Sequence, residues 1–346
     1  MIRFVFGLFL LFALLACSDS GSSLDASTEP VANVTLLSSV NGVGDNSYND
    51  QILAGVFRFN RNSGVPVRLL QPDSLEEARQ MVQEWIETYS AADSSLLILA
   101  SSEYQTMAQK LDAHLTGKGS RVLLLEGDSS GLPENVYSFW IDRYGASYLA
   151  GAIAGEYPSV ILAAAPGFSS LENSIEGFRK GYEAHKVVED TLVLYYISEE
   201  EGDESAFNNV EWAYLAMSAL ILNDLFSDSS AKVFFPLLGG AFKGALRAKD
   251  DCLDDNNFLI GMDVNYGDAV PKVPYSMTVE IKNVLLNYLE DWQSGKKWPR
   301  YTSLGLSDGA TSIVINKNYD NVEVFEKRYN QYYDEAVREE ARHAKK

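Results

Sequence analysis

The segment Leu96-Leu-Ile-Leu-Ala100 is a continuous apolar run, and a second such run, Val122-Leu-Leu-Leu125, follows it along the chain. Neither run alternates polar with apolar residues, which is typical of strands covered by helices on both faces. Between them, a helix is predicted from about Glu103 to Leu115. A strand, a helix and another strand of this kind predict a parallel, doubly wound α/β sheet.

The same alternation of strands and helices extends outward from this segment. Before it, strands are predicted at 33–39 and 65–70 and a helix at 74–90. After Arg143 a second alternation begins with a strand at 160–164 and ends with one at 258–262. A chain of 346 residues is long enough for two such units, so we expect two lobes joined by a hinge. The predicted organisation is residues 33–142 plus 264–316 in lobe 1, 143–263 in lobe 2, and a C-terminal helical extension over 317–346.

The N-terminus predicts an exported, lipid-anchored protein. Arg3 supplies a positive charge, Phe4 to Leu15 are apolar, and Leu14-Leu-Ala-Cys17 resembles the end of a bacterial lipoprotein signal. We therefore expect lipidation at Cys17, a flexible tether over residues 18–32, and a location in the bacterial cell envelope, on the periplasmic or surface face. An ordinary secretory signal with an incidental Cys is the alternative.

Composition argues against two classes of function. The formal net charge of −20 makes nucleic acid an improbable partner, because phosphate backbones require clustered Lys and Arg. The chain has only three His residues and lacks nucleophile-elbow, phosphate-loop and dinucleotide-binding patterns. We therefore expect no catalytic residues, no metal site and no cofactor, and a binding protein rather than an enzyme. A hydrolase on the same scaffold is the less favoured alternative.

The loop Asn41-Gly-Val-Gly-Asp-Asn-Ser-Tyr-Asn-Asp50 joins a predicted strand to a predicted helix. Ser47 or Asn46 is expected to cap that helix, which directs its free N–H groups into the space above the strand end. Ligands bind in that space in open α/β sheets. The alternative is an ordinary turn, since Gly, Asn and Asp are common in turns.

Polar and aromatic residues recur at predicted strand ends in both alternations. Carboxylates there can accept hydrogen bonds from ligand hydroxyl groups, and aromatic rings can stack on a planar ring or a sugar face. If the architecture holds, these side chains face one cleft between the lobes. The predicted ligand-binding residues are Asp45, Ser47, Tyr48, Asn49, Tyr104, Phe168, Gly240, Phe242 and Asp263.

Several short motifs, taken in order, resemble a known family. They are Gly44-Asp-Asn-Ser-Tyr-Asn49, Tyr144-Gly-Ala-Ser-Tyr-Leu-Ala-Gly151, Gly177-Phe-Arg-Lys-Gly181, Gly239-Gly240, Ile260-Gly-Met-Asp263 and Tyr275-Ser-Met277. With this order and spacing, the chain resembles the basic membrane protein lipoproteins, which are nucleoside-binding components of ABC importers. The resemblance covers most of residues 33–316 and implies a type I periplasmic-binding-protein fold.

The resemblance also implies roles for particular residues. Asp45, Asn49 and Asp263 stand where the family binds the ribose and base of a nucleoside, and Tyr48 stands where Phe is usual. Val279 occupies a position where the family often has Lys, and Leu53 and Ala54 lie where an aromatic residue is common.

The implied partners are a nucleoside-like small molecule and an ABC permease, with membrane contact through the lipid anchor only. We expect a monomer. The alternative is a sensory or interaction lipoprotein that uses the same two lobes without transport.

Overall fold

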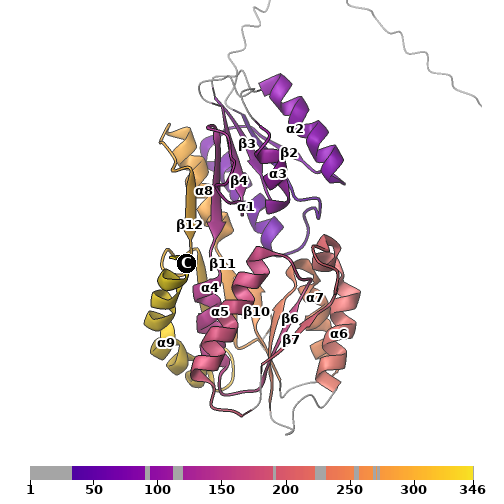
Figure 1. The fold of residues 1–346 in the computed structure, drawn as a ribbon, viewed down its shortest axis with the longest axis vertical. Helices are drawn as coiled ribbons and strands as arrows, with labels where there is room; N and C mark the ends of the chain where they lie inside the picture. Colours follow the sequence, from indigo (N-terminus) through magenta and orange to yellow (C-terminus); the bar gives the residue numbers. More distant parts are fainter. Residues whose placement is uncertain are drawn as a thin grey trace, which may run out of the picture.

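The computed structural model describes residues 33–89, 94–111, 120–189, 192–222, 231–252, 257–267, 270 and 273–345. The predicted signal segment, Cys17 and the tether lie outside the described residues, so these remain predictions. No helix within the described ranges is long and apolar enough to span a bilayer. The predicted α/β class with parallel sheets is confirmed, and its elements form an upper and a lower lobe (Figure 1).

Lobe 1 is built on a six-stranded sheet in the order β12-β5-β4-β3-β1-β2, in which every neighbouring pair is parallel. Its strands are β1 (Asn33–Leu37), β2 (Val67–Leu70), β3 (Ser95–Leu99), β4 (Arg121–Leu125), β5 (Val136–Ile141) and β12 (Tyr301–Leu304). One face packs on α1 (Tyr48–Ser63) and α8 (Ile281–Gln293), and the other on α2 (Leu75–Tyr89). Covering both faces buries β3 completely, which explains its continuous apolar run.

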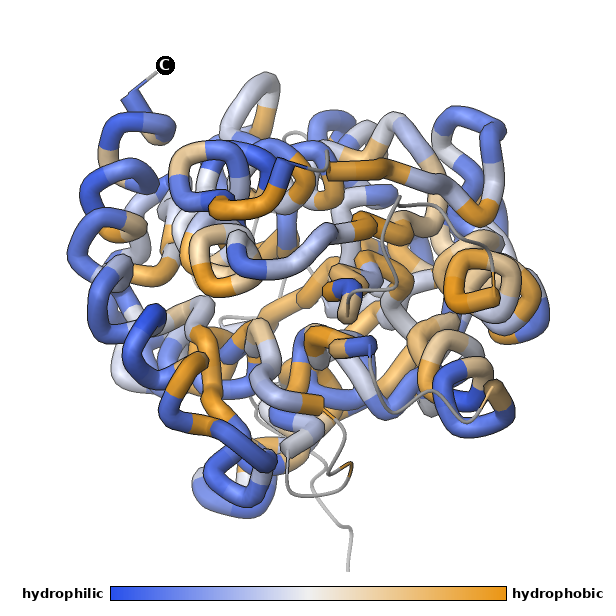
Figure 2. Tube along the Cα trace, turned by 90° about the horizontal axis from the view of Figure 1, so that it is seen from below, coloured by the Kyte–Doolittle hydropathy of each residue, from blue (hydrophilic) through white to orange (hydrophobic). Residues whose placement is uncertain are grey.

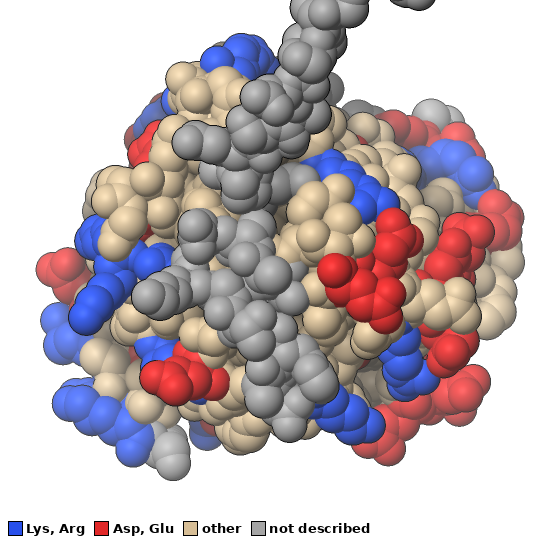
Figure 3. Space-filling view, turned by 90° about the horizontal axis from the view of Figure 1, so that it is seen from above, with Lys and Arg blue, Asp and Glu red and all other residues tan. Residues whose placement is uncertain are grey.

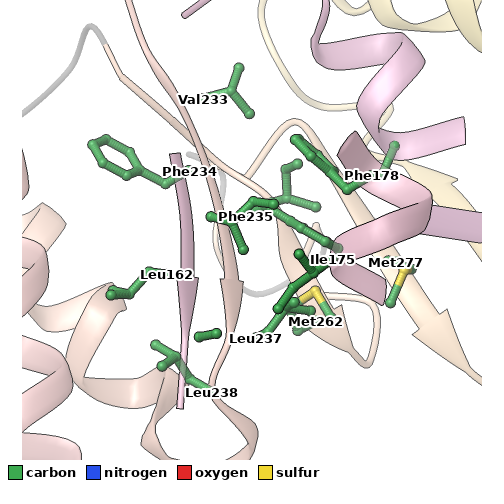
Figure 4. Close-up of a cluster of buried hydrophobic side chains, with 14 of the residues drawn as sticks. Leu162, Ile175, Phe178, Val233, Phe234, Phe235, Leu237, Leu238, Met262 and Met277 are labelled. Carbon is green, nitrogen blue, oxygen red and sulfur yellow. The ribbon is translucent and has the colours of Figure 1, made fainter. Parts of the chain in front are cut away.

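Lobe 2 is built on a four-stranded parallel sheet in the order β7-β6-β8-β9. Its elements are α4 (Tyr144–Ala154), β6 (Ser159–Ala163), α5 (Ser169–His185), β7 (Val193–Tyr196), α6 (Val210–Leu222), β8 (Val233–Leu237), α7 (Phe242–Asp251) and β9 (Phe258–Leu259). Phe178 of α5 stacks on Phe235 of β8 with ring centroids 4.5 Å apart, at the centre of the core in Figure 4. Hydrophobic residues concentrate in such interior segments, and hydrophilic residues on outer turns (Figure 2).

The small residues of α4 and α5 allow these two helices to pack very closely. A Cβ added at Gly151 of α4 would lie 2.1 Å from the carbonyl oxygen of Phe178, and one at Gly181 of α5 would lie 1.9 Å from that of Tyr148. Neither position has room for a methyl group. The glycines therefore determine the spacing between α4 and α5.

A third sheet, with strand order β10-β11-β13, lies where the lobes meet. Its strands are β10 (Gly261–Asp263), β11 (Tyr275–Val279) and β13 (Thr311–Ile315). Tyr275 and Met277 belong to the core of lobe 2, whereas Val279 belongs to that of lobe 1. The alternating apolar residues of β11 therefore pack on lobe 2 at its start and on lobe 1 at its end.

Two elements differ from their sequence-based expectations. The single strand predicted at 258–262 is divided into β9 and β10, which belong to different sheets. In place of the predicted helix 103–115, the structure has a 3-10 turn, η1 (Ser102–Tyr104), and the short α3 (Gln105–Ala108); residues 112–119 lie outside the described ranges.

The C-terminal helix α9 (Val322–His343) packs along α4 of lobe 2. Arg328 is 6% exposed and donates to the carbonyl oxygen of Ala152 from Nε (3.2 Å) and NH2 (2.7 Å), and its NH2 also donates to that of His185 (3.2 Å). Glu340 accepts from the backbone N–H groups of Leu306 (2.8 Å) and Ser307 (3.2 Å), just after β12. The helix therefore binds both lobe 2 and the segment that follows the edge strand of lobe 1.

Seen from above, the surface of lobe 1 carries separate groups of basic side chains and acidic groups gathered mainly to one side (Figure 3). No continuous basic area appears on the visible part of this face.

Candidate functional site

A cavity of about 180 Å³ lies between the lobes, at the carboxyl ends of the strands. Lobe 1 contributes residues that follow β1, β3 and β4, among them Ser39, Ser101 and Glu126. Lobe 2 contributes residues at or after the ends of β6, β8 and β10, among them Phe168 and Asp263. This is the position in which open α/β sheets bind ligands.

The loop 41–50 forms part of the cavity wall, and its conformation depends on two carboxylates. Asp45 accepts from the backbone N–H groups of Ser47 (2.8 Å), Asn49 (2.9 Å) and Asp50 (3.1 Å) at the start of α1. Asp50 in turn accepts from the N–H groups of Gly44 (2.6 Å) and Asn46 (2.7 Å). We expected Ser47 or Asn46 to cap α1, but the Asp45 carboxylate does so because it can accept several N–H groups at once.

Ser47 has a different role, because its side chain reaches the opposite lobe. Its hydroxyl group donates to Asp263 Oδ2 (2.7 Å), and Gln51 Nε2 donates to the Asp263 carbonyl oxygen (3.0 Å). Asp263 has φ of +65°, a conformation that is uncommon for residues other than Gly. Such conformations persist only where surrounding contacts hold them, as Ser47 and Gln51 do here.

Further hydrogen bonds join the loop to lobe 2. Asn41 Nδ2 donates to Glu204 Oε2 (3.3 Å), and Asn208 Nδ2 donates to the Asn41 carbonyl oxygen (3.3 Å). Lys243 Nζ donates to the carbonyl oxygen of Gly44 (3.2 Å). The loop predicted from sequence as one wall of a cleft therefore also links the lobes across it.

An ion pair that the sequence reasoning did not identify also lines the cavity. Arg143 NH2 lies 2.8 Å from Glu126 Oε1, and the two side chains are 11% and 9% exposed. The hydroxyl group of Tyr48 donates to the same oxygen (2.7 Å), while Glu126 Oε2 accepts from Arg143 NH1 (3.2 Å) and the N–H of Ile141 (3.3 Å). Burial and the charge of Glu126 raise the pKa of Tyr48, so Tyr48 remains a neutral donor.

The part of the cavity wall that comes from lobe 2 consists of aromatic rings and of backbone that lies close to the loop 41–50. The rings of Phe168 and Phe207 meet edge to face with centroids 4.9 Å apart. Gly239 adopts φ of +54°, and a Cβ at Gly240 would lie 3.2 Å from the Cβ of Asp45. A larger residue at 240 would push the Asp45 loop away, so the pair of glycines allows the two lobes to approach.

The structure brings most of the predicted binding residues to the cavity. Those that line it are Asp45, Tyr48, Asn49, Phe168, Gly240 and Asp263. Ser47 acts through its bond to Asp263. Tyr104 is fully buried and donates to the carbonyl oxygen of Ser38 (2.5 Å), and Phe242 is 1% exposed and packs on Tyr266 with centroids 4.6 Å apart. Tyr104 and Phe242 therefore support the walls from behind, because their rings fill the cores of the two lobes.

Other lining residues were missed. They include Glu126, Arg143, Glu204, Phe207 and Asn208. Glu126 directly follows β4, so its position after an apolar strand could have identified it. Glu204, Phe207 and Asn208 lie in the 3-10 turn η2 (Glu204–Asn208), for which the sequence has no strand-end signal. Val279 is fully buried in the core of lobe 1, and neither it nor Leu53 lines the cavity.

Within the described ranges, no group of three or more His, Cys, Asp or Glu residues is arranged to hold a metal ion.

Comparison with known proteins identifies the fold. No protein-family model and no curated protein matches the sequence. Among solved structures, the chain is similar to an ABC transporter solute-binding protein from Aeropyrum pernix K1, with a TM-score of 0.68 at 16% identity over 90% of this chain and 89% of that one.

Two further structures are similar. One is a periplasmic binding protein/LacI transcriptional regulator from Alkaliphilus metalliredigens QYMF complexed with D-xylulofuranose, with TM-score 0.56, 12% identity, and coverage of 82% of this chain and 97% of that one. The other is a 5-methylthioribose transporter solute-binding protein from Thermotoga lettingae TMO, with TM-score 0.59, 15% identity, and coverage of 86% and 92%. The chain therefore has the two-lobed type I periplasmic-binding-protein fold.

Proposed function

We propose that this chain is a solute-binding protein of an ABC importer, anchored to the cell envelope through lipid on Cys17. Its lobes close on a nucleoside or a similar small polar ligand and deliver it to a permease. In this proposal lobe 1 comprises residues 33–142 with α8 and β12, lobe 2 comprises 143–263, and β11 and the segments at Arg143 and Gly305 connect them.

The observation that carries the proposal is the cavity between the strand ends of the two lobes, bridged by the loop 41–50. A cavity in this place is reached by ligand only when the lobes separate, as in hinge-bending binding proteins. Asp263 and Asn49 offer hydrogen-bonding groups to a sugar, and Phe168 and Phe207 offer rings to a base. The ligand of the Thermotoga protein, 5-methylthioribose, is itself a ribose derivative.

Thermal unfolding with a ligand panel tests the binding role. We would heat the full-length protein in detergent with adenosine, guanosine, inosine, uridine, cytidine or ribose. A ligand present at a hundred times its Kd stabilises the native state by about 2.7 kcal/mol, which corresponds to a Tm rise of roughly 4 °C for a chain of this size. We expect at least one nucleoside to produce this rise.

Two variants locate the effect. Asp263→Asn should remove the Tm rise, because it changes a cavity carboxylate. Glu134→Gln should retain it, because Glu134 is exposed and precedes β5 at the end of the sheet away from the cavity. If no member of the panel raises the Tm, the nucleoside assignment is wrong.

The lipid anchor has its own test. We expect the protein in membrane fractions, with the mass of a lipidated chain beginning at Cys17. A Cys17→Ser variant should lose the lipid and the membrane association; if the unsubstituted chain is found without lipid, the anchor proposal fails.

A further inference from the structure

The cavity holds more negative charge than its own residues neutralise. Four carboxylates line it, from Asp45, Glu126, Glu204 and Asp263, against one guanidinium, from Arg143. Arg143 is paired with Glu126, and Asp45 accepts three backbone N–H groups at the start of α1. The remaining carboxylates, Glu204 and Asp263, both come from lobe 2.

These two carboxylates differ in their surroundings. Asp263 accepts from the Ser47 hydroxyl group and feels the positive charge of Arg143. Among the described residues, no Lys, Arg or His forms an ion pair with Glu204, whose hydrogen bond comes from the neutral amide of Asn41 (3.3 Å). Burial raises the pKa of Glu204 to about 7, with further contributions from the negative charges of Glu103 and Asp203. Glu204 is therefore the cavity carboxylate whose negative charge is least neutralised by its surroundings.

Glu103 reinforces this imbalance from the side of lobe 1. Its Oε1 accepts from the N–H of Val40 (3.0 Å), while its Oε2 is buried without a hydrogen-bond partner. Burial also raises the pKa of Glu103. When the lobes are together, the charges of Glu103 and Glu204 repel each other, and no Lys or Arg of the described ranges forms an ion pair with either. This repulsion costs free energy unless one carboxylate is protonated or a cation arrives.

The surroundings of Glu204 suit an organic cation rather than a bare ion. Phe207 lies in the same short turn as Glu204, and its ring meets that of Phe168. Aromatic faces attract cations, and Leu237 and Leu238 add apolar surface to the same cavity. A ligand with a charged amine beside an apolar or planar part would satisfy both kinds of surface.

We propose that the ligand of this cavity carries a protonated amine or a similar compact organic cation, and that Glu204 is its counter-ion. This inference rests on the proposed solute-binding function and narrows its ligand class. Anionic ligands are disfavoured, because the cavity guanidinium of Arg143 is already occupied by Glu126. A neutral nucleoside is then expected to bind more weakly than one that bears a cationic group.

We would test the cation proposal by isothermal titration calorimetry, with probes that are similar in shape but differ in charge. One set is 5′-amino-5′-deoxyadenosine, adenosine and adenosine 5′-monophosphate; the other is 1,5-diaminopentane, 1,5-pentanediol and glutarate. At pH 7.5 we expect the amine of at least one set to bind about tenfold or more tightly than its neutral counterpart, and the anion not to bind. Glu204→Gln should reduce this preference to within about twofold, whereas Glu134→Gln should retain it.

A pH series on the unsubstituted protein gives an independent reading. With the pKa of Glu204 near 7, its carboxylate is mostly charged at pH 8 and about nine-tenths protonated at pH 6. Affinity for the amine should therefore fall about tenfold between pH 8 and pH 6, while that for its neutral counterpart changes less than about twofold.

The outcomes separate the inference from the function on which it rests. If adenosine binds as tightly as its amino derivative, the cation proposal is overturned while solute binding stands. If the amine preference survives Glu204→Gln in a variant with normal circular dichroism and Tm, Glu204 is not the counter-ion. If no probe of either set binds, both the cation proposal and the nucleoside assignment are contradicted.

Discussion

The buried ion pair between Arg143 and Glu126, which lines the cavity, allows a quantitative test of how much this pair stabilises the fold. In Arg143→Met, Glu126 keeps its bonds to Tyr48 and to the N–H of Ile141 but loses two N–H donors and the compensating charge. Removing one partner of a buried pair costs about 3–5 kcal/mol because the other charge is left uncompensated. We expect Arg143→Met to lower the free energy of unfolding by that amount at pH 7.5.

The loss of stability on breaking an ion pair depends on how deeply the pair is buried, so an exposed pair is the matched control. Arg247 and Glu211 are also 2.8 Å apart, but their side chains are 46% and 62% exposed. Water screens the charges of exposed pairs, so Arg247→Met should lower the free energy of unfolding far less than Arg143→Met does. Urea unfolding followed by circular dichroism measures both variants under the same conditions.

Neutralising the remaining carboxylate supplies the second half of the test. Adding Glu126→Gln to Arg143→Met should recover about 1–3 kcal/mol, because an amide is less costly to bury than an unpaired carboxylate. The reasoning is refuted if Arg143→Met costs no more than Arg247→Met, or if the double variant is less stable than Arg143→Met alone.

Two further variants test the packing around α4. Gly181→Ala should destabilise the protein by about 3 kcal/mol, because its Cβ would lie 1.9 Å from the Tyr148 carbonyl oxygen. Helix propensity alone predicts the opposite, a gain in stability of about 1 kcal/mol. The sign of the stability change in urea unfolding decides between the clash and the propensity effect. Arg328→Met should lower the free energy of unfolding by about 3 kcal/mol and accelerate amide hydrogen exchange throughout α9, because the hydrogen bonds to the carbonyl oxygens of Ala152 and His185 are lost. Unchanged exchange in α9 would show that its other contacts are enough to hold the helix in place.

The sequence predicted those parts of the fold that depend on local patterns. Residues 96–99 and 122–125 lie in strands that are buried on both faces, and their lack of polar side chains is visible in the sequence itself. The division into β9 and β10 was not predictable in this way. Phe258 and Leu259 pair with β8, whereas Gly261 to Asp263 pair with β11, and pairing partners are set by tertiary contacts rather than by composition.

For the candidate site as well, the sequence predicted the residues that follow local patterns and missed those placed by tertiary contacts. Asp45 and Asp263 were found because they follow apolar runs, where strand ends meet in an α/β fold. The pairing of Glu126 with Arg143 was missed because it depends on the chain passing from β5 into α4 close to the end of β4. Phe207 and Glu204 were missed because a short 3-10 turn between β7 and α6 has no periodicity to mark it.

The loop 41–50 and the helix that follows concentrate the contacts between the lobes in one short stretch. Ser47, Gln51, Asn41 and Gly44 all make hydrogen bonds to lobe 2. Substitutions at Gln51 or Lys243, which do not line the cavity, would therefore shift the population of open and closed forms without altering the cavity surface. Because apparent affinity scales with the fraction of competent conformer, this loop can tune how tightly a solute is held independently of which solute is chosen.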